Sequence, residues 1–275
     1  MSLDILKISN EIDEGFLICI NCKTRFPIIQ KIPIIMEDFV SYIGIRRSLG
    51  GQLYHLSTTT VMKQFIKNSL SKIKNTHNDD HSLVEERWSE IYTSNRNSSF
   101  YSVVKNKISD LPSCNNVLEF GSSIGTLSGF LRKKHRNIFC VDMSFVATLY
   151  AKKQSFENLD CFVSDALNHP FGKIKFDLIL ALNMLEIVEP TEMLETISKQ
   201  IERGYILLTD PYDYTRGKNS VKFPLYAEDV RKKLRSIGFS ITKKTSQPNF
   251  INWTLKINPR TKLNYKVDMI IGRKH

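Results

Sequence analysis

Near the middle of the chain stands the sequence Asn116-Val117-Leu118-Glu119-Phe120-Gly121-Ser122-Ser123-Ile124-Gly125-Thr126-Leu127. An apolar, strand-like run ends here in a turn of small residues, and a helical pattern follows. This order is typical of a doubly wound α/β domain, which binds a nucleoside ligand at the carboxyl ends of its strands. The turn has few side chains, so its backbone can approach a ligand closely. Glu119 can accept hydrogen bonds from that ligand. The sequence therefore predicts a nucleoside site at residues 119–125.

Strand and helix patterns alternate from this point onward. The strand patterns occupy residues 116–120, 137–142, 159–164, 176–182 and 204–209. The helical patterns occupy residues 126–134, 144–154, 190–201 and 227–237. Five strands and the four helices that follow them predict an α/β fold with a parallel sheet. Two later strand-like runs, 239–245 and 265–272, have no helix between them, so we expect them to pair antiparallel and Trp253 to lie in the connecting loop.

A parallel sheet closed by a C-terminal antiparallel hairpin resembles the Rossmann-like sheet of class I S-adenosylmethionine (SAM)-dependent methyltransferases. The resemblance covers residues 115–275 and implies an enzyme that uses SAM as its cofactor. It also implies that Gly121, Ser122 and Gly125 form the loop under the amino-acid end of SAM. Ser123 replaces the middle glycine of the usual motif.

The ends of the next two strands complete the predicted cofactor site. Asp142 follows the glycine loop by about 20 positions, a spacing that suits hydrogen bonds to both ribose hydroxyls. Ser144 is expected to cap the following helix. The resemblance implies that Met143 lies against the adenine. It also implies that Asp165, with Ala166 beside it, contacts the adenine amino group.

The ends of the fourth and fifth strands face the transferred methyl group in this arrangement. Asn183 follows the fourth strand, and Asp210 and Tyr212 follow the fifth. These three are the candidate catalytic residues on the acceptor side, and Asn183 is also a candidate cofactor contact. A base is needed only for an acceptor that arrives protonated, and Asp210, Tyr212, Asp213 and Glu186 are the candidates.

Helical patterns also precede the first strand of the sheet. One spans residues 60–74, a second carries Arg87 and Tyr92, and a third carries Tyr101. Aromatic residues at helical spacing are more often core residues than cofactor contacts. Helices in this position nevertheless cover the cofactor in many methyltransferases. Arg87, Tyr92 and Tyr101 are therefore candidates for contact with the SAM carboxylate or the acceptor.

The N-terminal segment has a different character. Cys19-Ile20-Asn21-Cys22 precedes residues 25–36, which read as two short strands around a polar turn. This resembles the second half of the Trm112-like zinc-ribbon family, but Lys7-Ile8-Ser9-Asn10 replaces that family's first cysteine pair. Two sulfurs cannot complete a tetrahedral zinc site, so we expect no metal and a module that docks a protein partner. The predicted domains are a small β module (1–40), a helical linker or cap (41–110) and a methyltransferase domain (111–275).

The composition of the chain limits the class of protein and its location. The 275 residues are 41% hydrophobic and 24% charged, and no apolar run is long enough to span a membrane. The five cysteines form no regular framework and the N-terminus lacks a signal-like pattern, so we expect a cytoplasmic protein. The net charge is +11, and residues 215–275 carry 15 basic and 3 acidic side chains. Such a region is either a solubilising surface or a site of attraction for acidic acceptors or nucleic acid.

The acceptor remains open between several classes. Motifs at 121–125, 181–185 and 209–212 resemble the mercaptohistidine N-methyltransferases, which act on small molecules. Base-methylating signatures of the Asn/Asp-Pro-Pro-aromatic and Pro-Cys types are absent from the sequence. We therefore expect methyl transfer to nitrogen, oxygen or sulfur of a small molecule or short peptide. The alternatives are an enzyme acting on RNA or a translation-related protein, and a catalytically silent SAM-fold adaptor.

Overall fold

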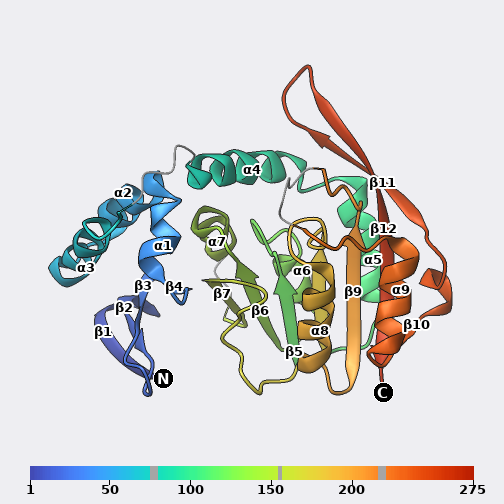
Figure 1. The fold of residues 1–275 in the computed structure, drawn as a ribbon, viewed down its shortest axis with the longest axis horizontal. Helices are drawn as coiled ribbons and strands as arrows, with labels where there is room; N and C mark the ends of the chain where they lie inside the picture. Colours follow the sequence, from blue (N-terminus) through green and yellow to red (C-terminus); the bar gives the residue numbers. More distant parts are fainter. Residues whose placement is uncertain (75–79, 154–156, 216–220) are drawn as a thin grey trace.

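The computed structural model describes residues 1–74, 80–153, 157–215 and 221–275. The strands in these ranges form one continuous sheet with helices on both faces (Figure 1). The strands are β1 (Ser2–Ile8), β2 (Ile12–Ile18), β3 (Arg25–Ile29), β4 (Ile32–Ile35), β5 (Asn116–Phe120), β6 (Asn137–Asp142), β7 (Leu159–Ser164), β8 (Leu178–Leu182), β9 (Gly204–Asp210), β10 (Phe239–Ile241), β11 (Phe250–Lys256) and β12 (Lys262–Lys274). The helices are α1 (Phe39–Gly44), α2 (Arg47–Leu56), α3 (Thr60–Leu70), α4 (His81–Asn95), α5 (Ser99–Ser109), α6 (Ser128–Leu131), α7 (Phe145–Lys152), α8 (Pro190–Gln200) and α9 (Ala227–Ser236).

The central strands confirm the predicted fold class. Their order is β4-β7-β6-β5-β8-β9-β12-β10, and all neighbours from β4 to β9 run parallel. β12 pairs antiparallel with β9, β10 and β11. The chain proceeds from β5 to β6 on one side and later returns to β8 on the other. The carboxyl end of β5 is therefore a topological switch point, where α/β sheets bind ligands.

Alternating side chains of the parallel strands pack against two different layers. In β8, Leu178 and Leu180 join a core with α5 and β11, whereas Ile179 and Ala181 join a core with α8 and α9. Because both faces are covered, the strand reads as a continuous apolar run. Strand β5 is also buried on both faces. Its packing within the sheet therefore fixes the position of the loop that follows it.

The C-terminal prediction is partly wrong. The antiparallel pairing of β10 with β12 is confirmed. Trp253, however, lies within β11 and opposite Tyr265 of β12, where a loop was expected. Buried Trp253 and Leu255 alternate with exposed neighbours, which is a strand signal that the nearby Pro248 obscured. The resulting β11–β12 hairpin projects beyond the body of the molecule (Figure 1).

The N-terminal strands join the same sheet. The two predicted strands in residues 25–36 are confirmed as β3 and β4, and Gln30 and Lys31 form the tight turn at φ 52° and 65°. β4 then pairs in parallel with β7. β1, α1 and α2 were not predicted. Gly50 within α2 faces the Leu70 side chain of α3, and a Cβ there would overlap it, so close helix packing explains a glycine that reads as a helix breaker.

The N-terminal strands, α1–α3 and part of the central sheet share a hydrophobic core. Ile34 of β4 packs there with Phe145 of α7 and Val163 of β7. Glu14 of β2 is buried and accepts hydrogen bonds from Thr58 and Thr59, which precede α3. The division of the chain into three domains stays a prediction. In the part of the chain that the structure describes, no helix is long and apolar enough to cross a bilayer.

Candidate active site

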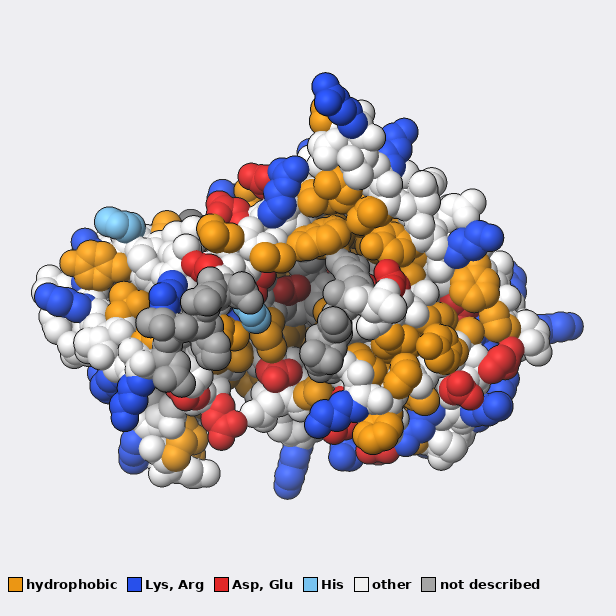
Figure 2. Space-filling view, turned by 45° about the horizontal axis from the view of Figure 1, so that its top comes forward, with side chains coloured by type: hydrophobic (Ala, Val, Ile, Leu, Met, Phe, Trp, Pro, Cys, Tyr) orange, Lys and Arg blue, Asp and Glu red, His pale blue; other side chains and the backbone are white. Residues whose placement is uncertain are grey.

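A cavity opens over the carboxyl ends of β5, β6 and β8, at the switch point of the sheet. Residues 121–123 line its floor, and α4 supplies one wall through Glu85, Trp88 and Tyr92. Figure 2 shows a hollow in this face, with hydrophobic side chains around it and acidic side chains inside. Both tryptophans of the chain, Trp88 and Trp253, line the cavity.

The loop after β5 has an unusual backbone. Gly121, Ser123 and Gly125 lie in the left-handed region, with φ of 65°, 48° and 73°. At Gly121 an added Cβ would overlap the Met184 side chain, so both the backbone angle and the packing require glycine. Ser122 lines the cavity, and its N–H donates to the carbonyl of Val141 at 3.1 Å. The loop thus presents backbone and small side chains to the cavity.

Asp142 ends β6 beside this loop and lines the cavity. Its Oδ2 accepts the N–H of Ser123 and its Oδ1 accepts the N–H of Ser144, both at 2.8 Å. Burial raises the pKa of Asp142 to about 6. Each carboxylate oxygen retains a second lone pair for a ligand hydroxyl. The predicted cap is confirmed, since Ser144 Oγ accepts the N–H of Ala147 in α7.

Glu119 lies behind the loop, 4% exposed, and also borders the cavity. It accepts a hydrogen bond from Ser128 Oγ at 3.3 Å. Burial raises the pKa of Glu119 to about 8, so the carboxyl group is mostly protonated at neutral pH. In that form it both donates and accepts hydrogen bonds.

The residues predicted on the adenine side lie in a neighbouring hollow. Met143 and Asp165 line it together with Tyr42 and Arg46, which come from the N-terminal part of the chain. The Tyr42 hydroxyl donates to the Met143 carbonyl at 2.9 Å, and Asp165 Oδ1 accepts the N–H of Leu167. The Ala166 side chain instead packs into the core on the α8–α9 face, where it cannot present its methyl group to a ligand.

The prediction for Arg87 is contradicted. Its guanidinium points to the outer side of α4, donating to Glu90 at 2.8 Å and to the Ile257 carbonyl at 3.2 Å. It does not line the cavity. Tyr92 and Tyr101 do, and Tyr92 stacks on Trp253 with the ring planes 5° apart. Trp88, four residues before Tyr92, is the site residue that helical spacing could have identified.

Asn183 follows β8 and lines the cavity with φ 55°. Its N–H donates to the Thr209 carbonyl at 2.6 Å, and its Oδ1 accepts from Thr209 Oγ1 at 3.0 Å. These bonds to β9 hold the side chain at the edge of the cavity. Glu186, three residues later, is fully buried and lines the cavity as well.

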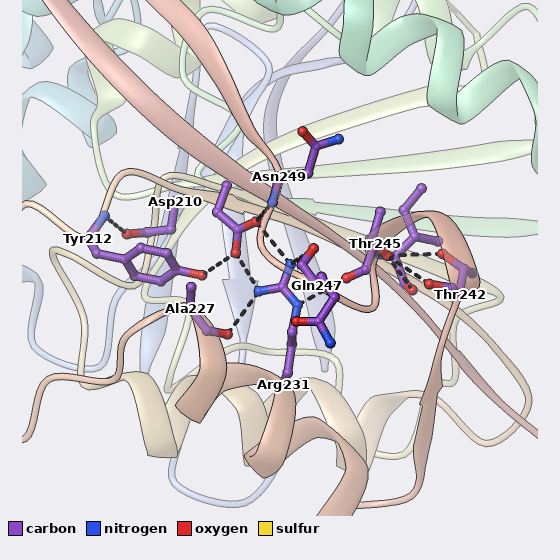
Figure 3. A network of polar contacts seen from close by, with 10 residues as sticks. Asp210, Tyr212, Ala227, Arg231, Thr242, Thr245, Gln247 and Asn249 are labelled. Carbon is purple, nitrogen blue, oxygen red and sulfur yellow. Dashed lines mark hydrogen bonds and ion pairs between the residues drawn. The ribbon is translucent and has the colours of Figure 1, made fainter.

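Asp210 and Tyr212 occupy a different position from the one predicted. Asp210 is 1% exposed, outside the cavity lining, and accepts the N–H groups of Leu185 and Tyr212 at 2.8 Å. Burial, with a further contribution from Glu186, raises the pKa of Asp210 to about 7. The Tyr212 hydroxyl donates to Asp268 at 2.9 Å (Figure 3). Burial and Asp268 raise its pKa far above the ordinary value, so Tyr212 is no base for the acceptor.

Asp268 belongs to a buried ion pair that anchors this region (Figure 3). Arg231 of α9 donates to Asp268 Oδ2 at 2.6 Å and to Oδ1 at 2.9 Å, and both side chains are fully buried. Arg231 also donates to the carbonyls of Ala227, Thr245 and Gln247. The pair is therefore well satisfied, and it fixes the segment after β9 through Tyr212.

The N-terminal segment carries two cysteines just after β2. Cys19 and Cys22 are free thiols, and Cys22 Sγ lies 3.0 Å from Thr24 Oγ1. Within residues 1–74, 80–153, 157–215 and 221–275 no group of three or more His, Cys, Asp or Glu side chains could hold a metal ion.

Residues 117–204 match the protein family described as "Methyltransferase domain". Among solved structures, N-methyltransferase NodS from Bradyrhizobium japonicum WM9, in complex with S-adenosyl-L-homocysteine, has a TM-score of 0.54 at 15% identity and covers 70% of this chain and 97% of its own. Magnesium protoporphyrin IX methyltransferase from Synechocystis PCC 6803, with bound SAH, has a TM-score of 0.52 at 18% identity and covers 70% and 95%. A chain from the complex of the Haloferax volcanii Trm112 methyltransferase activator has a TM-score of 0.53 at 13% identity and covers 70% and 98%. No curated protein matches the chain.

The domain match and the fold define the class of the protein. Residues 117–204 form a methyltransferase domain, and the chain has the fold of class I methyltransferases, as the sequence resemblance implied. The solved structures are too distant to carry more than the fold. The acceptor, the site residues and the role of the N-terminal strands are matters for the proposals below, which rest on the geometry of the site.

Proposed function

We propose that the chain transfers the methyl group of SAM to a small molecule or short peptide held in the cavity over β5. The observation that supports this most directly is the left-handed loop 121–125 beside the carboxylate of Asp142. Gly121 has a positive φ, and a Cβ there would overlap the side chain of Met184, which also lines the cavity. Such a combination suits the amino-acid and ribose parts of one nucleoside ligand.

The residues fit SAM in three places. Gly121, Ser122 and Gly125 would pass under its amino-acid end, and Asp142 would accept hydrogen bonds from the ribose hydroxyls. On the adenine side, Met143 and Asp165 are the candidates in the hollow that Tyr42 closes. When bound, SAM supplies an electrophilic methyl group on a sulfonium.

The protein's own contributions would be binding, orientation and the exclusion of water. Glu119, Asn183 and Tyr92 line the cavity beside the loop and are further candidates for SAM contact. The aromatic wall of α4 and β11 would desolvate an acceptor and hold it in line with the methyl group. An enclosed cavity of this kind suits a small acceptor or a single side chain.

A screen of acceptors tests the proposal. Purified protein is incubated with SAM and a panel of amines, thiols, imidazoles, short peptides and tRNA, and release of S-adenosylhomocysteine is measured. We expect release above background with at least one small acceptor or peptide. Release with tRNA alone would contradict the proposed substrate class.

An RNA substrate is the second candidate, because a basic hairpin projects near the cavity. Lys256, Arg260 and Lys262 lie at or beside the tip of the β11–β12 hairpin (Figure 1). Electrostatic attraction to phosphates is strongly salt-dependent. Binding of tRNA at low salt that weakens as salt is added would favour this candidate, and no binding at low salt would exclude it.

Contact with a protein partner through the N-terminal strands stays a prediction. β1 is the outermost strand of the sheet, and Leu3, Ile5 and Ile8 on it are exposed, which supports such a role. Affinity capture with the intact chain and with a Leu3→Asp/Ile5→Asp variant tests it. A partner retained equally by both proteins would argue against this surface. The cytoplasmic location also stays a prediction, consistent with five free cysteines.

A further inference from the structure

The cavity has a strongly acidic lining. Four carboxylates border it, and no Lys, Arg or His does among the residues that the structure describes. Glu85 Oε1 lies 2.8 Å from two nitrogens of Arg46, Asp142 accepts two backbone N–H groups, and Glu119 accepts a hydrogen bond from Ser128. Glu119 is mostly neutral at pH 7, because burial raises its pKa to about 8.

Glu186 is the fourth carboxylate, and its neighbour is also acidic. It is fully buried at the cavity wall, close to the carboxyl group of Asp210. Three backbone N–H groups, from Leu185, Glu186 and Tyr212, hold Asp210 in place behind the cavity. Two adjacent buried carboxyl groups oppose each other's ionisation, so the charged form of this pair is costly without a neighbouring cation. A cation at this point would relieve their repulsion.

Aromatic rings form another part of the lining. Trp88 and Tyr92 of α4 lie 5.6 Å apart between ring centroids, and Tyr92 lies 6.3 Å from Trp253 of β11. This row faces the same cavity as Glu186. Aromatic faces attract ammonium groups, most strongly where water is excluded. The aromatic rings and the Glu186 carboxylate therefore both favour a positively charged ligand.

The mouth of the cavity is apolar. Val84 of α4 and Ile187, next to Glu186, both line it and are 58% and 46% exposed. Figure 2 shows hydrophobic side chains around this hollow. An acceptor that enters here would leave an apolar portion against the rim and send its charged end inward.

We propose that the methyl acceptor is an amine with an aromatic or aliphatic body, held as its ammonium form by Glu186 and the aromatic row of Trp88, Tyr92 and Trp253. This deepens the proposed function and rests on it. The ammonium group first gives up one proton, and Glu186 is placed to accept it. The nitrogen lone pair set free in this way then forms the new N–C bond while the S–C bond breaks and leaves its electron pair on sulfur. Asp210 is a positioning residue behind Glu186.

Intrinsic fluorescence offers a direct test, because the only two tryptophans of the chain both line the cavity. The full chain, saturated with S-adenosylhomocysteine, is titrated with aryl-alkyl and alkyl amines, and with the alcohol and the carboxylate of the same skeleton. We expect the amines to quench fluorescence. Their dissociation constants should be at least roughly tenfold lower than those of the alcohol and the carboxylate of the same skeleton.

Two variants test whether Glu186 is the source of the preference for amines. Glu186→Gln keeps the shape of the side chain and should remove the preference for amines, raising their dissociation constants by at least roughly tenfold. Glu90→Gln makes the same charge change on the exposed side of α4 and should leave the preference intact. Affinity for S-adenosylhomocysteine, measured by calorimetry, should stay the same in both variants.

The proposal is overturned by amines that bind no more tightly than the alcohols or carboxylates, or that do not bind at all. It is also overturned by a Glu186→Gln variant that keeps the preference, or one that loses cofactor affinity instead of amine affinity. A wild-type chain that binds neither SAM nor S-adenosylhomocysteine would contradict the proposed function itself. Calorimetry with the cofactor therefore distinguishes a failure of the amine proposal from a failure of the proposed function.

Discussion

Ser123 occupies a backbone position that usually favours glycine. Its φ of 48° costs about 1 kcal/mol for a residue with a Cβ. The N–H of Ser123 donates to Asp142 at 2.8 Å, and a hydrogen bond to a charged group is worth about 1.5–3 kcal/mol. The serine therefore leaves the loop in its ligand-binding shape. From the sequence, Ser123 was visible only as a departure from the motif, because the compensating bond joins residues 19 positions apart.

Gly121 is the position in the loop where a side chain is not tolerated. We expect Gly121→Ala to weaken SAM binding by at least roughly tenfold, about 1.4 kcal/mol, because the added methyl group displaces Met184 and strains the backbone. Calorimetric titration measures the change. Gly172→Ala is a suitable control, since its φ is also positive but its Cβ would meet open space. Equal SAM affinity of Gly121→Ala and wild type would contradict the assigned cradle.

Asp142 is expected to bind the ribose of SAM. Asp142→Asn should lower SAM affinity by roughly 10- to 100-fold, since hydrogen bonds to a charged group are worth about 1.5–3 kcal/mol. The exposed Asp160 of the neighbouring strand gives a matched control, Asp160→Asn, which should bind SAM as the wild type does. Unchanged affinity of Asp142→Asn would mean that the ribose lies elsewhere.

Glu119 should make stability depend on pH. Its pKa of about 8 in the folded state lies above the ordinary value of 4.5, so the folded chain keeps a proton that the unfolded chain has released. Its contribution is therefore fully present below about pH 4.5 and is lost as the pH rises toward 8. We expect Glu119→Gln to reduce the fall in Tm between about pH 6 and about pH 8, as measured by differential scanning fluorimetry. An identical fall in both proteins would contradict a buried, protonated Glu119.

At the scale of elements, periodicity predicted the strands β5 to β9 and the helices between them, but missed β1, β11, α1 and α2, and did not show which face of a helix turns to the site. α4 was expected to contribute Arg87 and Tyr92, and only Tyr92 lines the cavity. The two residues lie five positions apart, on different sides of the helix. Arg87 donates instead to Glu90 and to the carbonyl of Ile257, which directly follows β11, a strand that was not predicted. Tyr212 was misassigned for the same reason, because Asp268 and Arg231 come from distant elements.

Tyr212→Phe separates a structural role from a catalytic one. Loss of the hydroxyl removes one hydrogen bond to Asp268, which keeps its bidentate pair with Arg231. We expect a loss of about 1 kcal/mol in the free energy of unfolding, measured in urea, and little change in kcat. A variant that is as stable as the wild type but inactive would restore Tyr212 to the acceptor site.

At the scale of the whole molecule, the central sheet was predictable and its N-terminal extension was not. β5 to β9 are buried on both faces, so each strand carries its own apolar signal in sequence. β4 joins β7 through main-chain hydrogen bonds and through the packing of Ile34. A single sequence does not show that β4 pairs with a strand so far along the chain. The N-terminal part of the chain reaches the hollow lined by Met143 and Asp165 through α1, whose Tyr42 hydroxyl donates to the Met143 carbonyl.

Ile34 tests how firmly the N-terminal strands are joined to the sheet. Its side chain is 0% exposed between β4 and the central core, and we expect Ile34→Ala to cost about 2–5 kcal/mol of stability. Ile5→Ala, at a position on β1 that is 47% exposed, should change stability by less than about 0.5 kcal/mol. Urea denaturation measures both variants. Equal stability of the two would indicate that the β4–β7 junction contributes little.

The central claim is that the cavity over β5 binds SAM, and calorimetric titration of the intact wild-type chain with SAM tests it most directly. We expect saturable binding with one SAM per chain and displacement by S-adenosylhomocysteine. No heat of binding at millimolar SAM would contradict both the assigned cofactor and the proposed methyl transfer.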